Sequence, residues 1–311
     1  MGIKCNLIVD SCCDLPFSMV DVSGVELIEF PFVHDGEEKQ DDLYRSLTPK
    51  EFYDAMRNKK KPSPTTAQVP ANILEAAFRR ACESGVPTVY LCFSSALSGS
   101  YDTALIVRDQ VLSDYPDAEL YVVDTMLASI AEGLLVLGAI DQRESGLSAL
   151  EMVSWAEEAR WFVNAQFMVD DLEALHRGGR VPTGIATAGA KLDVKPLLGF
   201  DLSGALSFSG VTRGRKKGIR SLAEFFRRKN DSAQIGQRII IAHADAPGDA
   251  NRLYEDLLKT EDGVLFTGSY IGPVIGSHVG PGMVAVAFWG PDRREDLGVA
   301  DRIARRVKSK E

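Results

Sequence analysis

Polar side chains that could bind or transform a small anion follow three short apolar runs in the first half of the chain. The runs and the loops after them are Asn6–Val9 with Asp10–Pro16, Pro87–Phe93 with Ser94–Tyr101, and Glu119–Val123 with Asp124–Thr125. Serine hydroxyls and free backbone N–H groups at a helix N-terminus can bind an anion without formal positive charge. A carboxylate or a phosphate would fit such a site, and simple helix capping is the alternative use of these serines.

The usual catalytic and metal-binding motifs are missing from the sequence. It contains no G-x-S-x-G, no H-E-x-x-H and no G-x-x-x-x-G-K-[ST]. Residues 280–285 match G-x-G-x-x-A but precede a predicted strand, so we exclude a dinucleotide site. The four histidines stand apart without companion cysteines, so we expect neither a metal ion nor a cofactor; they are His34, His176, His243 and His278.

His278 differs from the other histidines in its surroundings. It lies in the glycine-rich segment 272–282. So many glycines around one histidine indicate that the backbone closely approaches a ligand or another loop. A structural histidine with satisfied hydrogen bonds is the alternative interpretation.

The elements that position these loops follow a strand–helix alternation. The box Thr48-Pro49-Lys50-Glu51 predicts a helix that begins there and ends near Asn58. Further helices are predicted at Ala71–Ser84, Ser98–Ser113, Ser129–Arg143 and Ser148–Trp161. This βαβ pattern predicts an α/β fold with a mainly parallel sheet sandwiched by helices, and ligands at the carboxyl ends of its strands.

After Trp161 the pattern changes to strands with dense glycine. The predicted elements are a strand at Phe162–Val169, a hairpin over Leu198–Gly210 that turns at residues 202–204, a basic helix, strands at Arg238–Ala242 and Met283–Phe288, and a helix at Gly248–Thr260. We therefore predict an N-terminal α/β domain at 1–165, a second α/β domain at 166–290 and a charged helical tail at 291–311. Without a low-complexity linker, the two domains should be tightly apposed.

Composition narrows the class of protein. The chain has 311 residues, 45% of them hydrophobic, and a net charge of −9, which fits a soluble globular protein and disfavours nucleic-acid binding. Residues 126–140 form the most apolar stretch, but Glu132 interrupts it, so we predict a buried helix and no transmembrane segment. The start lacks a signal-peptide pattern, and the five cysteines suggest reduced thiols, so we expect a cytoplasmic protein.

One segment opposes this acidic balance. Eight of the seventeen residues from Arg213 to Lys229 are basic, and Glu224 alone opposes them. The segment is either a solvated helix face or a surface that meets a negatively charged partner.

Taken in order, these segments resemble the DegV family of bacterial fatty-acid-binding proteins. The resemblance covers most of the chain. It rests on Val9-Asp10-Ser11 with Asp14-Leu15-Pro16, Pro64-Thr65-Thr66-Ala67-Gln68, Ser94–Tyr101, Val123-Asp124-Thr125, Asp170-Asp171-Leu172 with Arg177-Gly178-Gly179-Arg180, Lys195-Pro196-Leu197-Leu198, Arg213–Lys217 and Gly272–Gly282. It implies a two-domain DegV-like fold that holds one long-chain fatty acid at the domain interface.

The resemblance also implies a partner and roles for particular residues. Such proteins carry the acyl chain for a fatty acid kinase, whose separate ATP-binding subunit phosphorylates the carboxylate to acyl phosphate for phospholipid synthesis. Thr66, Ser95 and His278 fall where the family contacts the carboxylate, with Ser94 and Thr65 as near neighbours. Arg180, Arg213 and Arg215 fall where the family presents positive charge to the kinase and its nucleotide. A carrier of this kind needs no catalytic residue of its own.

Two residues of the chain differ from the family pattern. Ala67 replaces a serine usual in the family, and Glu132 stands where an apolar residue is common.

Two other functions are alternatives to a fatty-acid carrier. One is an acyl hydrolase or transferase that uses Ser95 with His278, although no third residue is evident to orient the histidine. The other is a sensory module for another anionic lipid. The sequence leaves the chain length, saturation and branching of the fatty acid, and the oligomeric state, open.

Overall fold

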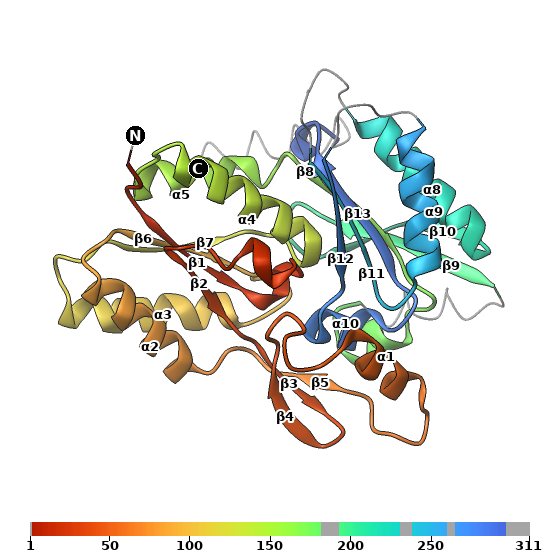
Figure 1. Ribbon diagram of the computed structural model, residues 1–311, viewed down its shortest axis with the longest axis horizontal. Helices are drawn as coiled ribbons and strands as arrows, with labels where there is room; N and C mark the ends of the chain where they lie inside the picture. Colours follow the sequence, from red (N-terminus) through yellow and green to blue (C-terminus); the bar gives the residue numbers. More distant parts are fainter. Residues whose placement is uncertain (1, 182–192, 231–237, 260–264, 297–311) are drawn as a thin grey trace, which may run out of the picture.

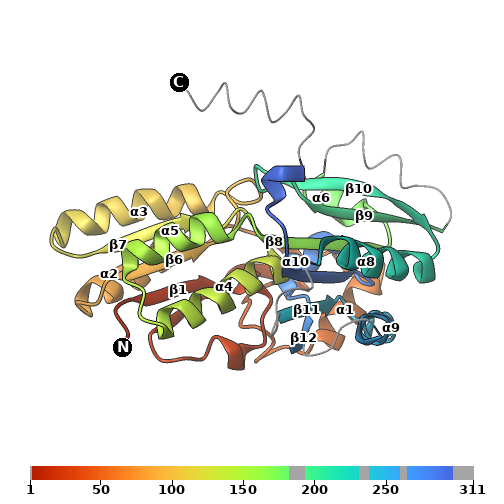
Figure 2. The same cartoon turned by 90° about the horizontal axis from the view of Figure 1, so that it is seen from above.

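The computed structural model describes residues 2–181, 193–230, 238–259 and 265–296. Two larger sheets lie side by side, and a small third sheet lies near the end of the first (Figures 1 and 2). Within these residues, no helix combines the length and the apolar character needed to cross a membrane.

The first sheet is parallel throughout, as predicted. Its strands lie in the order β2-β1-β6-β7; their bounds are Val25–Ile28, Asn6–Asp10, Thr88–Cys92 and Leu120–Asp124. All five residues of β6 are buried, as is typical of a central strand covered on both faces. Helices α2 (Ala71–Glu83) and α3 (Ser100–Asp114) cover one face, and α4 (Ser129–Glu144) and α5 (Ala149–Ala159) cover the other (Figure 1).

The second sheet is almost entirely antiparallel. Its order is β10-β9-β8-β13-β11-β12; the bounds are Leu206–Arg213, Val194–Phe200, Val163–Met168, Val284–Trp289, Arg238–His243 and Leu265–Tyr270. Only β11 and β12 pair in parallel. Helices α8 (Arg215–Lys229) and α9 (Pro247–Leu258) cover its outer face, at the end of the molecule remote from α2 and α3 (Figure 2).

Helix α4 packs between the two larger sheets. It contacts β1 of the first sheet and β8, β11 and β13 of the second. Both sides of the helix are therefore apolar, and 12 of its 16 residues are buried. This confirms the prediction of a buried helix in residues 126–140. Gly133 allows the close approach, because a Cβ there would lie 2.5 Å from the carbonyl oxygen of Cys13.

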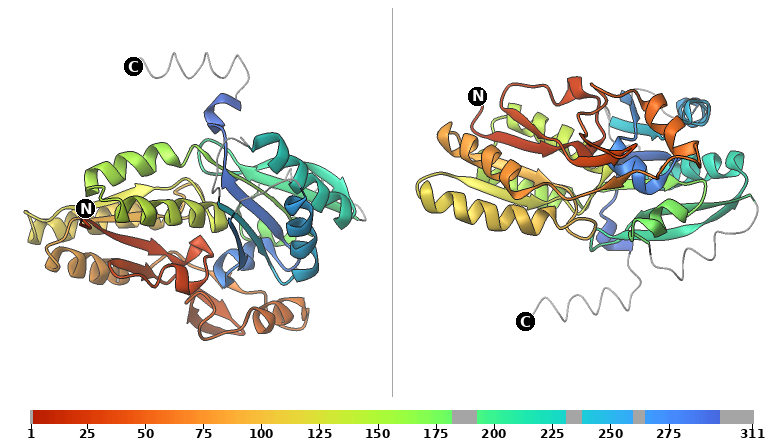
Figure 3. Two further views of the ribbon diagram at one scale, coloured as in Figure 1. Left: turned by 45° about the horizontal axis from the view of Figure 1, so that its top comes forward. Right: turned by 90° about the horizontal axis from the view of Figure 1, so that it is seen from below.

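The small third sheet supports a short helix that the sequence did not predict. Its strands lie in the order β4-β3-β5, with bounds Glu37–Gln40, Pro31–His34 and Thr65–Thr66. Helix α10 (Pro273–Val279) packs against β3 and β5, and α1 (Pro49–Arg57) lies beside it (Figure 3). The capping box predicted at Thr48 is present at the start of α1. Among the described residues, the other helices are α6 (Glu173–Arg177) and 3-10 turns at Ser11–Cys13, Phe17–Met19 and Arg293–Asp296.

Two sequence predictions meet the structure only in part. The predicted domain boundary after residue 165 falls inside β8, which pairs with β9 and β13, so the domain division stays a prediction. Of the predicted helical tail, residues 297–311 lie outside the described residues, and residues 293–296 form a 3-10 turn.

Candidate functional site

An amphipathic cavity of about 200 Å³ lies between the two larger sheets. Most of its wall is apolar; this part includes Phe30, Phe93, Ala128, Ile130, Ala131, Phe167, Phe200, Leu206, Val274, Ile275, Met283 and Ala285. These residues come from the loops after β2 and β6, the start of α4, the inner face of the second sheet, and α10. The cavity therefore lies at the carboxyl ends of parallel strands, as predicted.

Several polar residues of the cavity wall come from neighbouring segments; they are Thr66, Gln68, Ser98, Arg180 and His278, while Ser129 and Gln166 line the cavity beside apolar residues of α4 and β8. The Thr66 hydroxyl and His278 Nε2 are hydrogen-bonded at 2.8 Å. Arg180 donates to the carbonyl oxygens of Gly178 and Leu97, and Gly178 lies against the His278 ring. Gly99 follows Leu97 at the start of α3 and lies against Gln68. These residues form what we call the polar end of the cavity, and the rest of its wall is mainly apolar, apart from Ser129 and Gln166.

His278 is neutral near pH 7 in this environment. Burial, with the charges of Arg180 and Arg177, lowers the pKa of His278 from 6.5 to about 4. Its Nδ1 is buried and has no hydrogen-bond partner among the described residues. A triad histidine would instead have Nδ1 held by an acceptor.

The glycine-rich segment around His278 brings the backbone close to other segments, as predicted. A Cβ on Gly272 would lie 2.7 Å from the Asp14 carboxylate, and one on Gly276 would lie 2.5 Å from the Tyr53 hydroxyl. Asp14 also accepts hydrogen bonds from the Gly272 N–H and from the hydroxyl of Ser129 at the start of α4. Asp14 thus joins two walls of the cavity.

Arg180 lies in the cavity wall beside His278. The residue is half-buried, and burial lowers the pKa of its guanidinium, which is nonetheless cationic at neutral pH. Both of its hydrogen bonds go to neutral carbonyls, and no carboxylate pairs with it among the described residues. Arg180 was predicted to face a partner, and the structure also gives it access to an anion at the polar end.

The other three predicted head-group residues do not line the cavity. The exposed Ser95 donates to the Asp124 carboxylate at 2.5 Å, and its N–H donates to the same carboxylate. The buried Ser94 donates to the carbonyl of Gly204 at 2.9 Å. Thr65 is exposed on β5 and points away from its neighbour Thr66.

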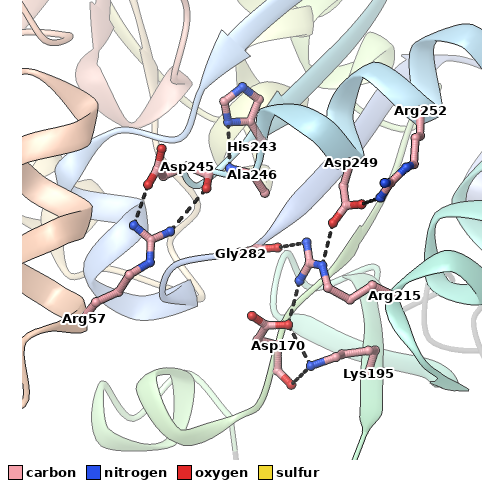
Figure 4. A network of polar contacts seen from close by, with 10 residues as sticks. All are labelled: Arg57, Asp170, Lys195, Arg215, His243, Asp245, Ala246, Asp249, Arg252 and Gly282. Carbon is pink, nitrogen blue, oxygen red and sulfur yellow. Dashed lines mark hydrogen bonds and ion pairs between the residues drawn. The ribbon is translucent and has the colours of Figure 1, made fainter.

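The two other predicted partner-facing arginines lie in different environments. Arg213, at the end of β10, is exposed. Arg215 is instead held inside a polar network, in which it pairs with Asp170 at 2.6 Å and Asp249 at 2.5 Å and donates to the carbonyl of Gly282 (Figure 4). A partner-facing role therefore does not fit Arg215, because carboxylates and a carbonyl already occupy its guanidinium.

Glu132 does not line the cavity either. It is fully buried close to Asp10 and Asp14, and a proton on its carboxyl group can be shared with the Asp10 carboxylate in a hydrogen bond. Burial, together with the nearby charges of Asp10 and Asp14, raises the pKa of Glu132 well above its usual value. The side chain is therefore held as a neutral acid.

Four polar residues of the cavity wall were not among the predicted site residues; they are Gln68, Ser98, Ser129 and Gln166. Gln68 and Ser98 lie near Thr66 and Arg180. They stand within the segments 64–68 and 94–101 that carried the resemblance, but nothing in the sequence showed which residues of each loop point inward. The turn that follows β5 and the start of α3 decide this.

The chain is similar to proteins of one family over most of its length. Residues 4–290 match a family model described as "Uncharacterised protein, DegV family". A DegV domain-containing protein of Clostridium perfringens is 37% identical over 287 residues, which cover 92% of this chain and 98% of that protein. The structure described as "Fatty Acid Binding of a DegV family Protein from Thermus thermophilus" has 27% identity and a TM-score of 0.82, and covers 93% of this chain and 100% of that one. The Bacillus subtilis DegV structure, described as a fatty acid binding protein, has 28% identity, the same coverage and a TM-score of 0.80.

Proposed function

Because the chain belongs to the DegV family, we propose that it binds one long-chain fatty acid and presents the carboxylate to a separate kinase subunit for phosphorylation to acyl phosphate. In this proposal the protein acts in the cytoplasm as a carrier, without a catalytic residue or metal of its own. The observation that carries the proposal is an apolar cavity with the Thr66–His278 pair at its polar end.

The apolar wall supports a hydrocarbon tail as the ligand. Burial of each methylene contributes about 0.8 kcal/mol, so a long chain supplies ample affinity before the head group makes any contact. The head-group site can therefore hold the carboxylate weakly and leave it reactive. Relatives described as fatty acid binding proteins share this fold at 27% and 28% identity.

The polar end supports a carboxylate as the head group. Thr66 can donate its hydroxyl, His278 can donate from Nε2 when Nδ1 carries no proton, and Arg180 adds a positive charge. Ser95, Ser94 and Thr65 remain head-group candidates only through the family resemblance. Ser95 would have to release Asp124 to reach the ligand.

The hydrolase alternative receives no geometric support. It needs a hydrogen bond between Ser95 and His278, but Ser95 is bonded to Asp124 and His278 to Thr66. A sensory module for another anionic lipid would use the same cavity. The identity of the bound lipid separates that function from a carrier.

The kinase step is tested by coupled acyl phosphate formation. In the presence of the kinase subunit and ATP, we expect Arg213→Glu to slow phosphorylation without changing the amount of bound fatty acid, because the exposed charge steers association. Lys59→Glu reverses a charge that is likewise exposed, on the loop after α1, and serves as the matched control. Equal rates for both variants and the wild type would contradict the role of Arg213, and no acyl phosphate with any of the three would contradict the kinase proposal.

A further inference from the structure

The backbone conformation at Gly178 does not require a glycine. It follows α6 with φ −74° and ψ −8°, a conformation open to any residue. A Cβ at this position would lie 2.9 Å from Cε1 of His278 and closer still to Nδ1. The absence of a side chain therefore makes room for the His278 ring.

At the adjacent Gly179, the backbone conformation itself favours glycine. Gly179 has φ +72°, which disfavours other residues, and a Cβ there would meet nothing within 4 Å. The two glycines of the Arg177-Gly178-Gly179-Arg180 segment therefore have different structural roles. Gly179 allows the chain to turn, and Gly178 allows the turn to contact the ring.

We propose that Gly178 is a positioning residue for the carboxylate end of the cavity, and that it acts by letting the His278 ring lie where Nε2 reaches Thr66. This inference rests on the proposed function. The ring is confined between the backbone of Gly178 on one side and Thr66 on the other, and helices α6 and α10 pack together at this point. The carbonyl of Gly178 also accepts a hydrogen bond from Arg180, so one residue sets the place of both groups.

A methyl group at position 178 should displace the ring and break the 2.8 Å contact with Thr66. The apolar interior lies beyond this contact and is unchanged. Gly178→Ala should therefore weaken recognition of the carboxylate and spare binding of the tail. Loss of one such hydrogen bond corresponds to about a 3- to 10-fold loss of affinity.

The test compares palmitate with hexadecanol, which has the same tail and no carboxylate. We expect Gly178→Ala to bind hexadecanol as the wild type does and to lose about 3- to 10-fold in its preference for the acid. Gly248→Ala is the matched control, since the same methyl group in the first turn of α9 would meet nothing within 4 Å. A Gly178→Ala protein with the wild-type preference would overturn the inference.

A double variant shows whether the effect passes through His278. If it does, adding Gly178→Ala to His278→Ala should cost nothing further, whereas equal losses in both backgrounds would refute the mechanism. If Gly178→Ala alone does not fold, the double variant should fold, because the ring is gone; failure of both would also refute it.

The ring position can be followed without any ligand. NMR signals of the His278 imidazole nitrogens should change in Gly178→Ala and stay unchanged in Gly248→Ala. The NMR measurement therefore tests the role of Gly178 separately from fatty-acid binding. A wild type that binds no fatty acid contradicts the proposed function, and an unchanged imidazole spectrum contradicts the role of Gly178.

Discussion

His278 makes the stability of the protein depend on pH within a defined window. Its pKa is lowered from 6.5 to about 4 in the folded protein, so the unfolded chain takes up this proton first as pH falls. The stabilisation is complete above pH 6.5 and is lost as pH falls toward 4. Because one pKa unit is worth about 1.36 kcal/mol, the full effect is about 3 kcal/mol.

The variant His278→Gln removes this titration and keeps an amide donor near Thr66. Urea denaturation of both proteins at pH 7 and pH 4.5 gives the difference in free energy of unfolding at each pH. We expect the wild type to lose about 2 to 3 kcal/mol relative to the variant between these two values. His176→Gln is the control, because His176 is exposed on α6. A difference between wild type and variant that stays constant with pH would show that the pKa of His278 is not lowered in the folded protein.

The same group should respond to the ligand. A bound carboxylate places a negative charge beside the ring, which favours the imidazolium and raises the pKa of His278. NMR titration of delipidated and fatty-acid-loaded protein should therefore show His278 titrating at higher pH in the loaded form. An identical titration in both forms would place the head group elsewhere.

Three further outcomes follow from particular contacts. Glu132→Leu should raise the free energy of unfolding by about 1–3 kcal/mol, and more at pH 8 than at pH 5, because a buried acid whose pKa is raised makes the folded protein less stable as pH rises. Asp10 keeps its hydrogen bonds from the Tyr90 hydroxyl and the Phe93 N–H in this variant, and destabilisation in urea melts would contradict the prediction. Thr66→Val should weaken palmitate binding by about 3- to 10-fold in calorimetry, and Ser95→Ala should weaken it less, because Ser95 is hydrogen-bonded to Asp124. A larger loss of affinity in Ser95→Ala would show that Ser95 contacts the carboxylate. Arg215→Ala should lower the melting temperature, because it leaves Asp170 and Asp249 without this partner, and an unchanged melting temperature would argue against a structural role.

The parts of the fold predicted correctly are those with local signals. The apolar runs of β1, β6 and β7, the capping box before α1 and the buried helix α4 each stand out within a short window of sequence. The small β4-β3-β5 sheet was missed, because β4 is polar and β5 has only two residues. Pairing between distant segments, which no local pattern encodes, creates that sheet.

The candidate site was predictable as a set of loops but not as a set of contacts. The pairing of Thr66 with His278 joins residues 212 positions apart and depends on how α10 packs against β5. Ser95 and Arg215 have suitable chemistry in their motifs, but Asp124 binds the first, and Asp170 with Asp249 the second. Sequence shows which groups are available, and packing decides which of them face the cavity.

The lipid content of the purified protein tests most directly whether the cavity is a fatty-acid site. Organic extraction followed by mass spectrometry should yield close to one long-chain fatty acid per protein molecule. The delipidated protein should gain thermal stability on addition of palmitate or oleate, since a ligand that binds the native state stabilises it. A protein that yields no fatty acid, and whose melting temperature neither lipid changes, would contradict the claim that the cavity is a fatty-acid site.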